Sequence, residues 1–184
     1  MAPRKPAPVH VPLSVCQQVC HLATAWAQRT TTPRFTRVAP ARRRDDQDRA
    51  AQAFARQTGT RYIGGGTFRA VFEVAAHFAL KLPWGNQQSH YDGTAANATE
   101  LQMWATATPY TQRWLAPVLA ADPQGRWLLM PRTRPLSDAS ARRMVRASTH
   151  ITERLRITDL DSASNWGLWG VRPVIIDYAG MDPV

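Results

Sequence analysis

The stretch RYIGGGTFRAVFEVAAHFALKL, residues 61–82, decides the fold of this chain. It places three consecutive glycines, Gly64–Gly66, ahead of two short apolar runs at 70–74 and 77–82. Runs of this length and composition predict β-strands, and the two-residue link Ala75-Ala76 predicts a tight hairpin between them. Glycines next to a strand let backbone N–H groups approach an anion closely. The stretch therefore predicts an antiparallel hairpin beside a glycine turn that an anion can approach closely.

Lysine is rare in this chain, and Lys81 lies on the second of these strands. Two of the 23 Lys and Arg residues are lysines, and the other is Lys5. A lysine between apolar neighbours needs a counter-ion when it is buried, and a helix predicted at 95–107 carries Glu100, which can supply one. The alternatives are a Lys81 ammonium that reaches water at the strand edge and a Glu100 carboxylate on the surface.

An oxygen-rich set of side chains surrounds the last predicted strand, residues 174–176. Asp159, Asp161 and Asn165 precede the strand in a polar loop, and Asp177 directly follows it. Carboxylate and amide oxygens are ligands that suit Mg²⁺. The alternative is ordinary capping of the loop backbone by Asn and Asp side chains.

Taken in order, these segments resemble the protein-kinase-like fold over about residues 60–180. The glycine turn is similar to the loop that covers the phosphates of ATP. Lys81 resembles the strand lysine that holds the α- and β-phosphates, and Glu100 resembles the helix glutamate that pairs with it. Leu128-Leu129-Met130-Pro131 is similar to the strand-to-hinge segment, and Asp177-Tyr178-Ala179-Gly180 to the Asp-Phe-Gly metal motif. Short kinase-like proteins of bacteriophages are the members that the chain resembles in size.

The resemblance implies a phosphotransferase that depends on ATP and Mg²⁺, with an unknown acceptor. It implies Lys81 as a catalytic residue, together with Asp159 or Asp161 as the base. Asn165 follows the first aspartate by six residues and the second by four, so both alternatives stay open. Asn165 and Asp177 would hold the metal. The residues implied to bind the nucleotide are Gly64, Gly65, Gly66, Thr67, Phe68, Lys81, Glu100 and Met130.

We expect an α+β fold, with a kinase-like N-lobe of an antiparallel sheet plus one helix. The C-lobe would be much reduced, because only four residues follow Gly180. The 184 residues suffice for one domain with a core. The expected parts are a basic Pro-rich tail, a basic helical segment and a minimal kinase-like domain, at 1–12, 13–58 and 59–184. Helices are predicted at 14–29, from about 45 to 59, and at 138–156.

The formal net charge is +10, and it gathers in the N-terminal third. Residues 1–58 hold ten Lys and Arg against three Asp and Glu, a net of +7. Such a surface can bind nucleic acid or another polyanion, or it is simply a solvated face. No DNA- or RNA-binding motif accompanies it.

A second function fits the same residues. The kinase-like fold can serve as a catalytically inactive binding module that docks on a protein partner and modulates it, with or without nucleotide. The basic N-terminal third favours such a role. No apolar run reaches the roughly 18 to 20 residues of a membrane span, and no secretory signal follows Met1. We expect a cytoplasmic protein with no membrane partner, in the host cell if a phage encodes it.

Overall fold

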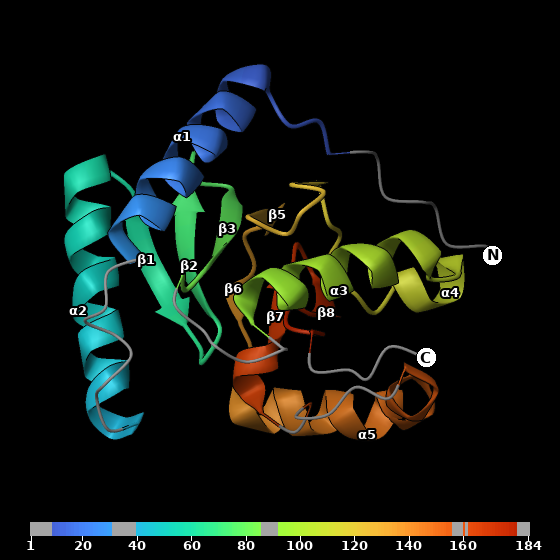
Figure 1. Ribbon diagram of the computed structural model, residues 1–184. Helices are drawn as coiled ribbons and strands as arrows, with labels where there is room; N and C mark the ends of the chain where they lie inside the picture. The colour runs from blue at the N-terminus through green and yellow to red at the C-terminus, as the bar shows by residue number, and fades with distance from the viewer. Residues whose placement is uncertain (1–8, 31–39, 86–91, 156–159, 161, 180–184) are drawn as a thin grey trace.

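The computed structural model describes residues 9–30, 40–85, 92–155, 160 and 162–179, and it has an α+β architecture (Figure 1). The helices are α1 (Leu13–Thr30), α2 (Pro40–Thr58), α3 (Gly93–Thr106), α4 (Pro109–Gln112) and α5 (Asp138–Leu155). The strands are β1 (Arg61–Gly65), β2 (Arg69–Val74), β3 (Phe78–Pro83), β4 (Ala120–Ala121), β5 (Leu128–Pro131), β6 (Arg134–Pro135), β7 (Trp166–Trp169) and β8 (Arg172–Ile175). Over these described ranges, no helix is both long enough and apolar enough to cross a bilayer. The predicted α+β class is confirmed.

The larger sheet has the strand order β1-β2-β3-β5-β4, and its neighbours are antiparallel. The predicted hairpin forms its centre, with Arg69 opposite Pro83 and Val74 opposite Phe78. The link is one residue longer than predicted, because His77 belongs to the turn. Ala75 and Ala76 have φ angles of 50° and 59°, a left-handed conformation that costs a residue with a Cβ roughly 1–2 kcal/mol.

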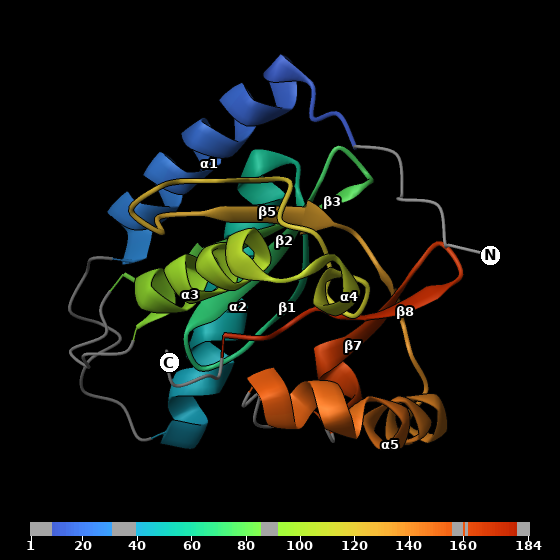
Figure 2. The ribbon, with the colours of Figure 1, turned by 90° about the vertical axis from the view of Figure 1, so that its right-hand side faces the viewer.

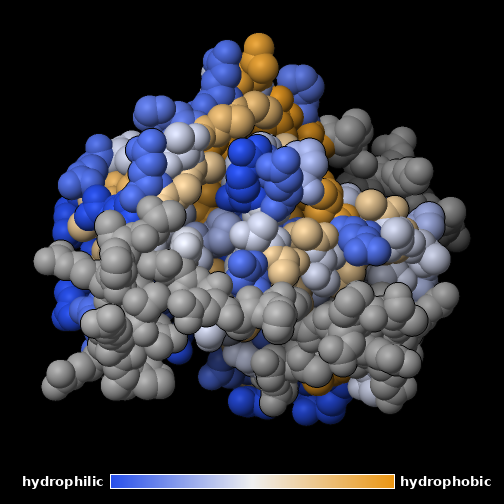
Figure 3. Space-filling model, in the orientation of Figure 1, coloured by the Kyte–Doolittle hydropathy of each residue, from blue (hydrophilic) through white to orange (hydrophobic). Residues whose placement is uncertain are grey.

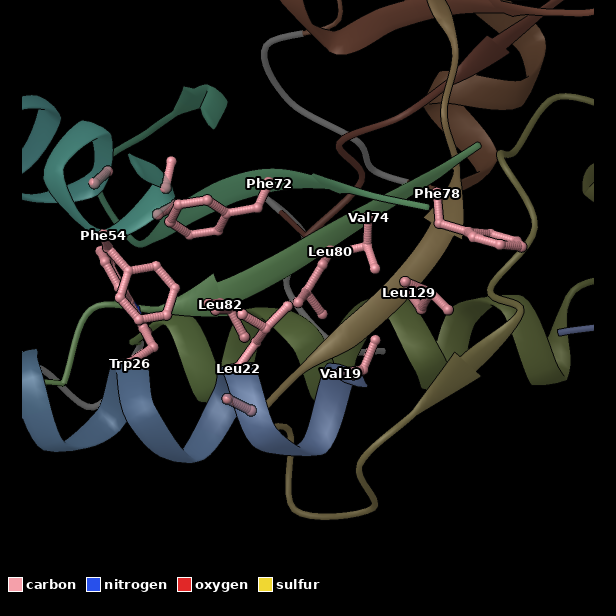
Figure 4. Packing of buried hydrophobic residues seen from close by; sticks show 14 of the residues in the cluster. Val19, Leu22, Trp26, Phe54, Phe72, Val74, Phe78, Leu80, Leu82 and Leu129 are labelled. Carbon is pink, nitrogen blue, oxygen red and sulfur yellow. The ribbon is translucent and has the colours of Figure 1, made fainter. Parts of the chain in front are cut away.

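Helices α1 and α2 cover one face of this sheet (Figures 1 and 4). Trp26 of α1 is only 1% exposed, and its indole Nε1 donates to the carbonyl of Pro83 at 2.8 Å. Its ring lies 5.0 Å from that of Phe54 on α2 and 5.2 Å from that of Phe72 on β2. Large aromatic side chains contribute strongly to a core when they bury this much surface. The basic N-terminal helices therefore share one hydrophobic core with the sheet.

Helix α3 lies on the opposite face of the sheet from α1 (Figure 2). Side chains alternate along a strand, so Leu80 and Leu82 enter the core beneath α1 while Lys81 points to α3. The helix begins at Gly93 after the N-cap Asp92, whose carboxylate accepts hydrogen bonds from two backbone N–H groups. This cap fixes the start of α3 and thereby positions its later residues over the sheet.

The smaller sheet, in the order β6-β7-β8, packs with α5 around a second apolar cluster. Trp166, Val174, Ile175 and Tyr178 are fully or almost fully buried there. Helix α5 forms where a helix was predicted at 138–156, and it turns the fully buried Ser148 and the partly buried Met144 inward. Leu128 and Met130 of β5 belong to the same cluster, which therefore packs the smaller sheet against the larger one.

Several elements differ from the sequence predictions. Helix α2 begins at Pro40 rather than near residue 45, in keeping with the preference of proline for the first helical turn. The apolar run at 115–120 has no counterpart among the predicted elements, and only its last residue belongs to a strand, β4. The N–H of Ala116 bonds the carbonyl of Ile175 on β8 at 2.8 Å, and the N–H of Leu119 bonds the carbonyl of Leu129 on β5 at 2.9 Å. Strand β7 was not predicted, because a glycine inside the short sequence WGLW weakens the strand signal.

Candidate functional site

A buried ion pair connects strand β3 to helix α3. The Nζ atom of Lys81 lies 2.8 Å from both carboxylate oxygens of Glu100, and both side chains are almost completely buried. The structure therefore brings together the two residues that the sequence paired. Lys81 therefore does not reach water at the strand edge, and Glu100 does not lie on the surface, so both alternatives are excluded. A buried charge of this kind is tolerated only when it is matched and hydrogen-bonded.

The segment directly after β8 also contacts this ion pair. Lys81 Nζ donates to the carbonyl of Ile176 at 2.6 Å, and the backbone N–H of Tyr178 donates to Glu100 Oε1 at 3.1 Å. Burial and the nearby Arg69 guanidinium lower the pKa of Lys81, while Glu100 and Asp177 oppose that shift. The ammonium is therefore held by carboxylate and carbonyl oxygens in a largely water-free environment.

Arg69 is a third member of the cluster, and sequence reasoning missed it. Its Nη1 lies 3.0 Å from Glu100 Oε2, and its Nη2 lies 2.7 Å from Asp177 Oδ1. Nη1 also donates to Asn97 Oδ1 at 3.2 Å. The observed register explains the miss: with Val71 opposite Lys81, alternation puts Arg69 on the same face of the sheet as that lysine. The predicted two-residue link pairs Ala70 with Lys81 instead and puts Arg69 on the other face.

Asn165 directly precedes β7 and Asp177 follows β8, so both residues lie at the same end of this hairpin. The N–H of Ile176 donates to the carbonyl of Asn165 at 2.8 Å, which holds the two segments together. The Asp177 side chain is 49% exposed. Burial alone would raise the pKa of its carboxyl, but the charges of Arg69 and Lys81 outweigh burial and lower the pKa to about 2. The carboxylate is therefore ionised at neutral pH.

The donor chemistry of this pair fits a magnesium ion. Mg²⁺ is usually held by one or two carboxylates together with water and substrate phosphates, and Asp177 and Asn165 supply a carboxylate and an amide. One oxygen of Asp177 is already committed to Arg69. Across the part of the chain that the structure describes, no group of three or more His, Cys, Asp or Glu side chains forms a metal cluster. A metal here would rely on water or a phosphate for its other ligands.

The glycine turn lies at the same end of the sheet as Arg69. Gly64 and Gly65 belong to β1, and a Cβ on Gly65 would lie 3.0 Å from the carbonyl oxygen of Arg69. The carbonyl of Phe68 accepts from the N–H of Trp84 at 3.0 Å. A Cβ on Gly93 would clash with that same carbonyl oxygen. Gly66 and Thr67 are at least partly exposed at the tip. The turn is thus packed closely against the start of α3.

The remaining predicted residues lie apart from the ion cluster or outside the described residues. Met130 is buried on β5 opposite Ala79 and packs in the second apolar cluster. Asp159 and Asp161 both lie outside the described residues. Between them, the carbonyl of Leu160 accepts from the indole of Trp166 at 2.7 Å. The structure therefore groups the lysine, glutamate and Asp177 but leaves both candidate bases unplaced.

An open cavity of about 510 Å³ lies away from this cluster. It is formed by the β2–β3 turn, the segment after β5 and one side chain of β7, and its lining includes Phe78, Arg132 and Trp169. None of the charged residues around Lys81 lines it. The chemistry of the ion cluster, rather than this cavity, therefore defines the candidate site.

Comparison with known protein families, with curated proteins and with solved structures finds no match for this chain. The function is therefore inferred from the geometry of the ion cluster and from the sequence motifs.

Proposed function

We propose that this chain binds ATP with Mg²⁺ and transfers its γ-phosphoryl group, as a minimal member of the protein-kinase-like fold. The observation that carries the proposal is the buried contact of Lys81 Nζ with both oxygens of Glu100 at 2.8 Å. A lysine on the third strand of an antiparallel sheet and a glutamate on the following helix are the parts that such a site requires. Asp177, directly after the last strand, supports the same proposal.

Each residue has a definite task in this proposal. Glu100 holds the Lys81 ammonium in place, so that it can orient the α- and β-phosphates without reorganisation. The backbone of the glycine turn covers the phosphates, and Asn165 with Asp177 would hold the metal. A bound Mg²⁺ would neutralise the charge that develops on the transferred phosphoryl group. Asp159 or Asp161 would accept the proton of the acceptor hydroxyl.

One observation favours the second function, a catalytically inactive module that docks on a protein partner. The Arg69 guanidinium lies on the Asp177 carboxylate, so the cluster is ion-paired without any ligand. A pure scaffold would keep such a network for stability alone. The basic helices suit an acidic partner or nucleic acid, since Arg44, Arg49 and Arg56 are exposed on α2 and its surface is largely hydrophilic (Figure 3).

Release and transfer of γ-labelled phosphate from ATP separate the two functions. The wild-type chain is incubated with Mg²⁺ and labelled ATP, alone and with a cell lysate as a source of acceptors, beside Asp177→Asn. Asp46→Asn, which removes an exposed carboxylate from α2, is the matched control. We expect transfer by the wild type and the control and a loss of at least a hundredfold in Asp177→Asn. Nucleotide binding without any transfer would favour the binding module.

A further inference from the structure

We propose that Arg69 is a built-in competitor of the divalent cation at Asp177, and that it gives way only when a phosphate takes over its guanidinium. The inference rests on the proposed function in taking Asp177 as a metal ligand. Arg69 is only 6% exposed, and its Nη2 is 2.7 Å from Asp177 Oδ1. A guanidinium so placed occupies an oxygen that a metal would otherwise use.

The charges of the cluster already balance without a metal. Two cations, Arg69 and Lys81, face two carboxylates, Glu100 and Asp177, within one set of hydrogen bonds. A divalent cation added at Asp177 would meet the positive charge of Arg69, which lies 2.7 Å from the carboxylate, and that of Lys81 in the same cluster. The cation alone is therefore repelled while Arg69 stays in place.

The partners of Arg69 allow it to release Asp177 without leaving the cluster. Its guanidinium also bonds Glu100 and Asn97, so these attachments remain when the contact with Asp177 breaks. Arginine binds phosphate oxygens through two parallel N–H groups. Arg69 directly follows the glycine turn, and its carbonyl accepts from the N–H of Gly66 at 2.9 Å. A phosphate under that turn would lie within the neighbourhood of the released side chain.

The consequence is a coupling between two ligands. An anion that draws Arg69 away from Asp177 raises the affinity for the cation, and by linkage the cation raises the affinity for the anion equally. The metal and the nucleotide then bind together rather than in sequence. The unliganded protein keeps its metal ligand covered by an internal cation.

Titration with Mn²⁺ alone, followed by electron paramagnetic resonance of the free ion, tests this competition without any enzymatic activity. We expect Arg69→Gln to bind Mn²⁺ at least tenfold more tightly than the wild type, and the gain to vanish in the double variant Arg69→Gln/Asp177→Asn. Arg49→Gln, which removes an exposed arginine from α2, is the matched control and stays within twofold of the wild type. An Arg69→Gln variant within twofold of the wild type, or a gain that survives loss of Asp177, overturns the proposal.

A second variant keeps the test decisive if Arg69→Gln does not fold. Arg69→Lys retains the charge, but a single ammonium cannot reproduce the fork that spans Glu100 and Asp177. We expect it to bind Mn²⁺ at least threefold more tightly than the wild type, and no gain in a folded Arg69→Lys overturns the proposal. A separate titration with Mg·ATP tests the proposed function, because that function requires nucleotide binding. A gain in Mn²⁺ affinity without nucleotide binding supports the competition and rejects the phosphotransferase, whereas nucleotide binding without that gain does the reverse.

Discussion

Arg69 and Lys81 reach the same buried carboxylate from neighbouring strands. Arg69 Nη1 lies 3.0 Å and Lys81 Nζ 2.8 Å from Glu100 Oε2. Glu100 also accepts from the backbone N–H of Tyr178. One carboxylate therefore joins two strands of the larger sheet, a helix and the segment after β8, which makes it the central structural residue of the candidate site.

Loss of the Glu100 charge should destabilise the whole protein. Glu100→Gln leaves two buried cations with only partial compensation from Asp177, and breaking a buried ion pair from one side costs about 3–5 kcal/mol. Urea denaturation measures the change in the free energy of unfolding. Asp46→Asn is the control, because it removes a carboxylate from an exposed pair, which contributes about 0–1 kcal/mol. A Glu100→Gln loss no larger than that of the control would contradict the account.

The Asp177 carboxylate should make the free energy of unfolding depend on pH in the acid range. Its pKa in the folded protein is about 2, below the ordinary 3.8, so the folded state holds its proton more weakly than the unfolded state does. The stabilisation is present above about pH 4 and is lost as the pH falls towards 2. Unfolding free energies measured between pH 2 and 7 should show this loss in the wild type and a smaller one in Asp177→Asn. Parallel curves of unfolding free energy against pH for the two proteins would contradict this role of the Asp177 carboxylate.

Substitutions in the β2–β3 turn should stabilise the protein. Ala75 and Ala76 both have positive φ angles, and residues with a Cβ are strained there. The double substitution Ala75→Asn/Ala76→Gly should raise the free energy of unfolding by about 1 kcal/mol, because Asn and Gly adopt this conformation readily. Thermal denaturation measures the gain. Ala79→Gly on β3 is the control and should destabilise instead; an unchanged melting temperature in the turn variant would count against the strain.

Trp26 should report how strongly the N-terminal helices stabilise the sheet. Trp26→Ala removes a side chain that packs on Phe54 and Phe72, and the expected loss is about 3–5 kcal/mol. Trp26→Phe keeps part of that packing but leaves the carbonyl of Pro83 without its indole donor, which costs about 1–3 kcal/mol. Chemical denaturation should rank the two variants in that order. Near-wild-type stability in Trp26→Ala would mean that α1 adds little to the sheet.

Local patterns predicted much of the fold and part of the site. The hairpin followed from its apolar runs, and Lys81 with Glu100 followed from one unusual lysine and a helix that could face it. Arg69 was missed because its role depends on strand register, and one arginine among many carries no signal of its own. The pairing of Ala116 with Ile175 of β8 was not predicted, since that partner lies far away in the sequence. Contacts of that kind follow from tertiary packing rather than from local propensity.

Calorimetric titration with Mg·ATP tests the central claim, that the Lys81–Glu100 pair forms a nucleotide phosphate site. The proteins are the wild type, Lys81→Met, and Lys5→Met, which replaces the other lysine of the chain. The account predicts that the wild type and Lys5→Met bind alike and that Lys81→Met binds at least tenfold more weakly, a loss of about 1.4 kcal/mol. No binding by the folded wild type at millimolar Mg·ATP, or equal binding by folded Lys81→Met, would contradict it.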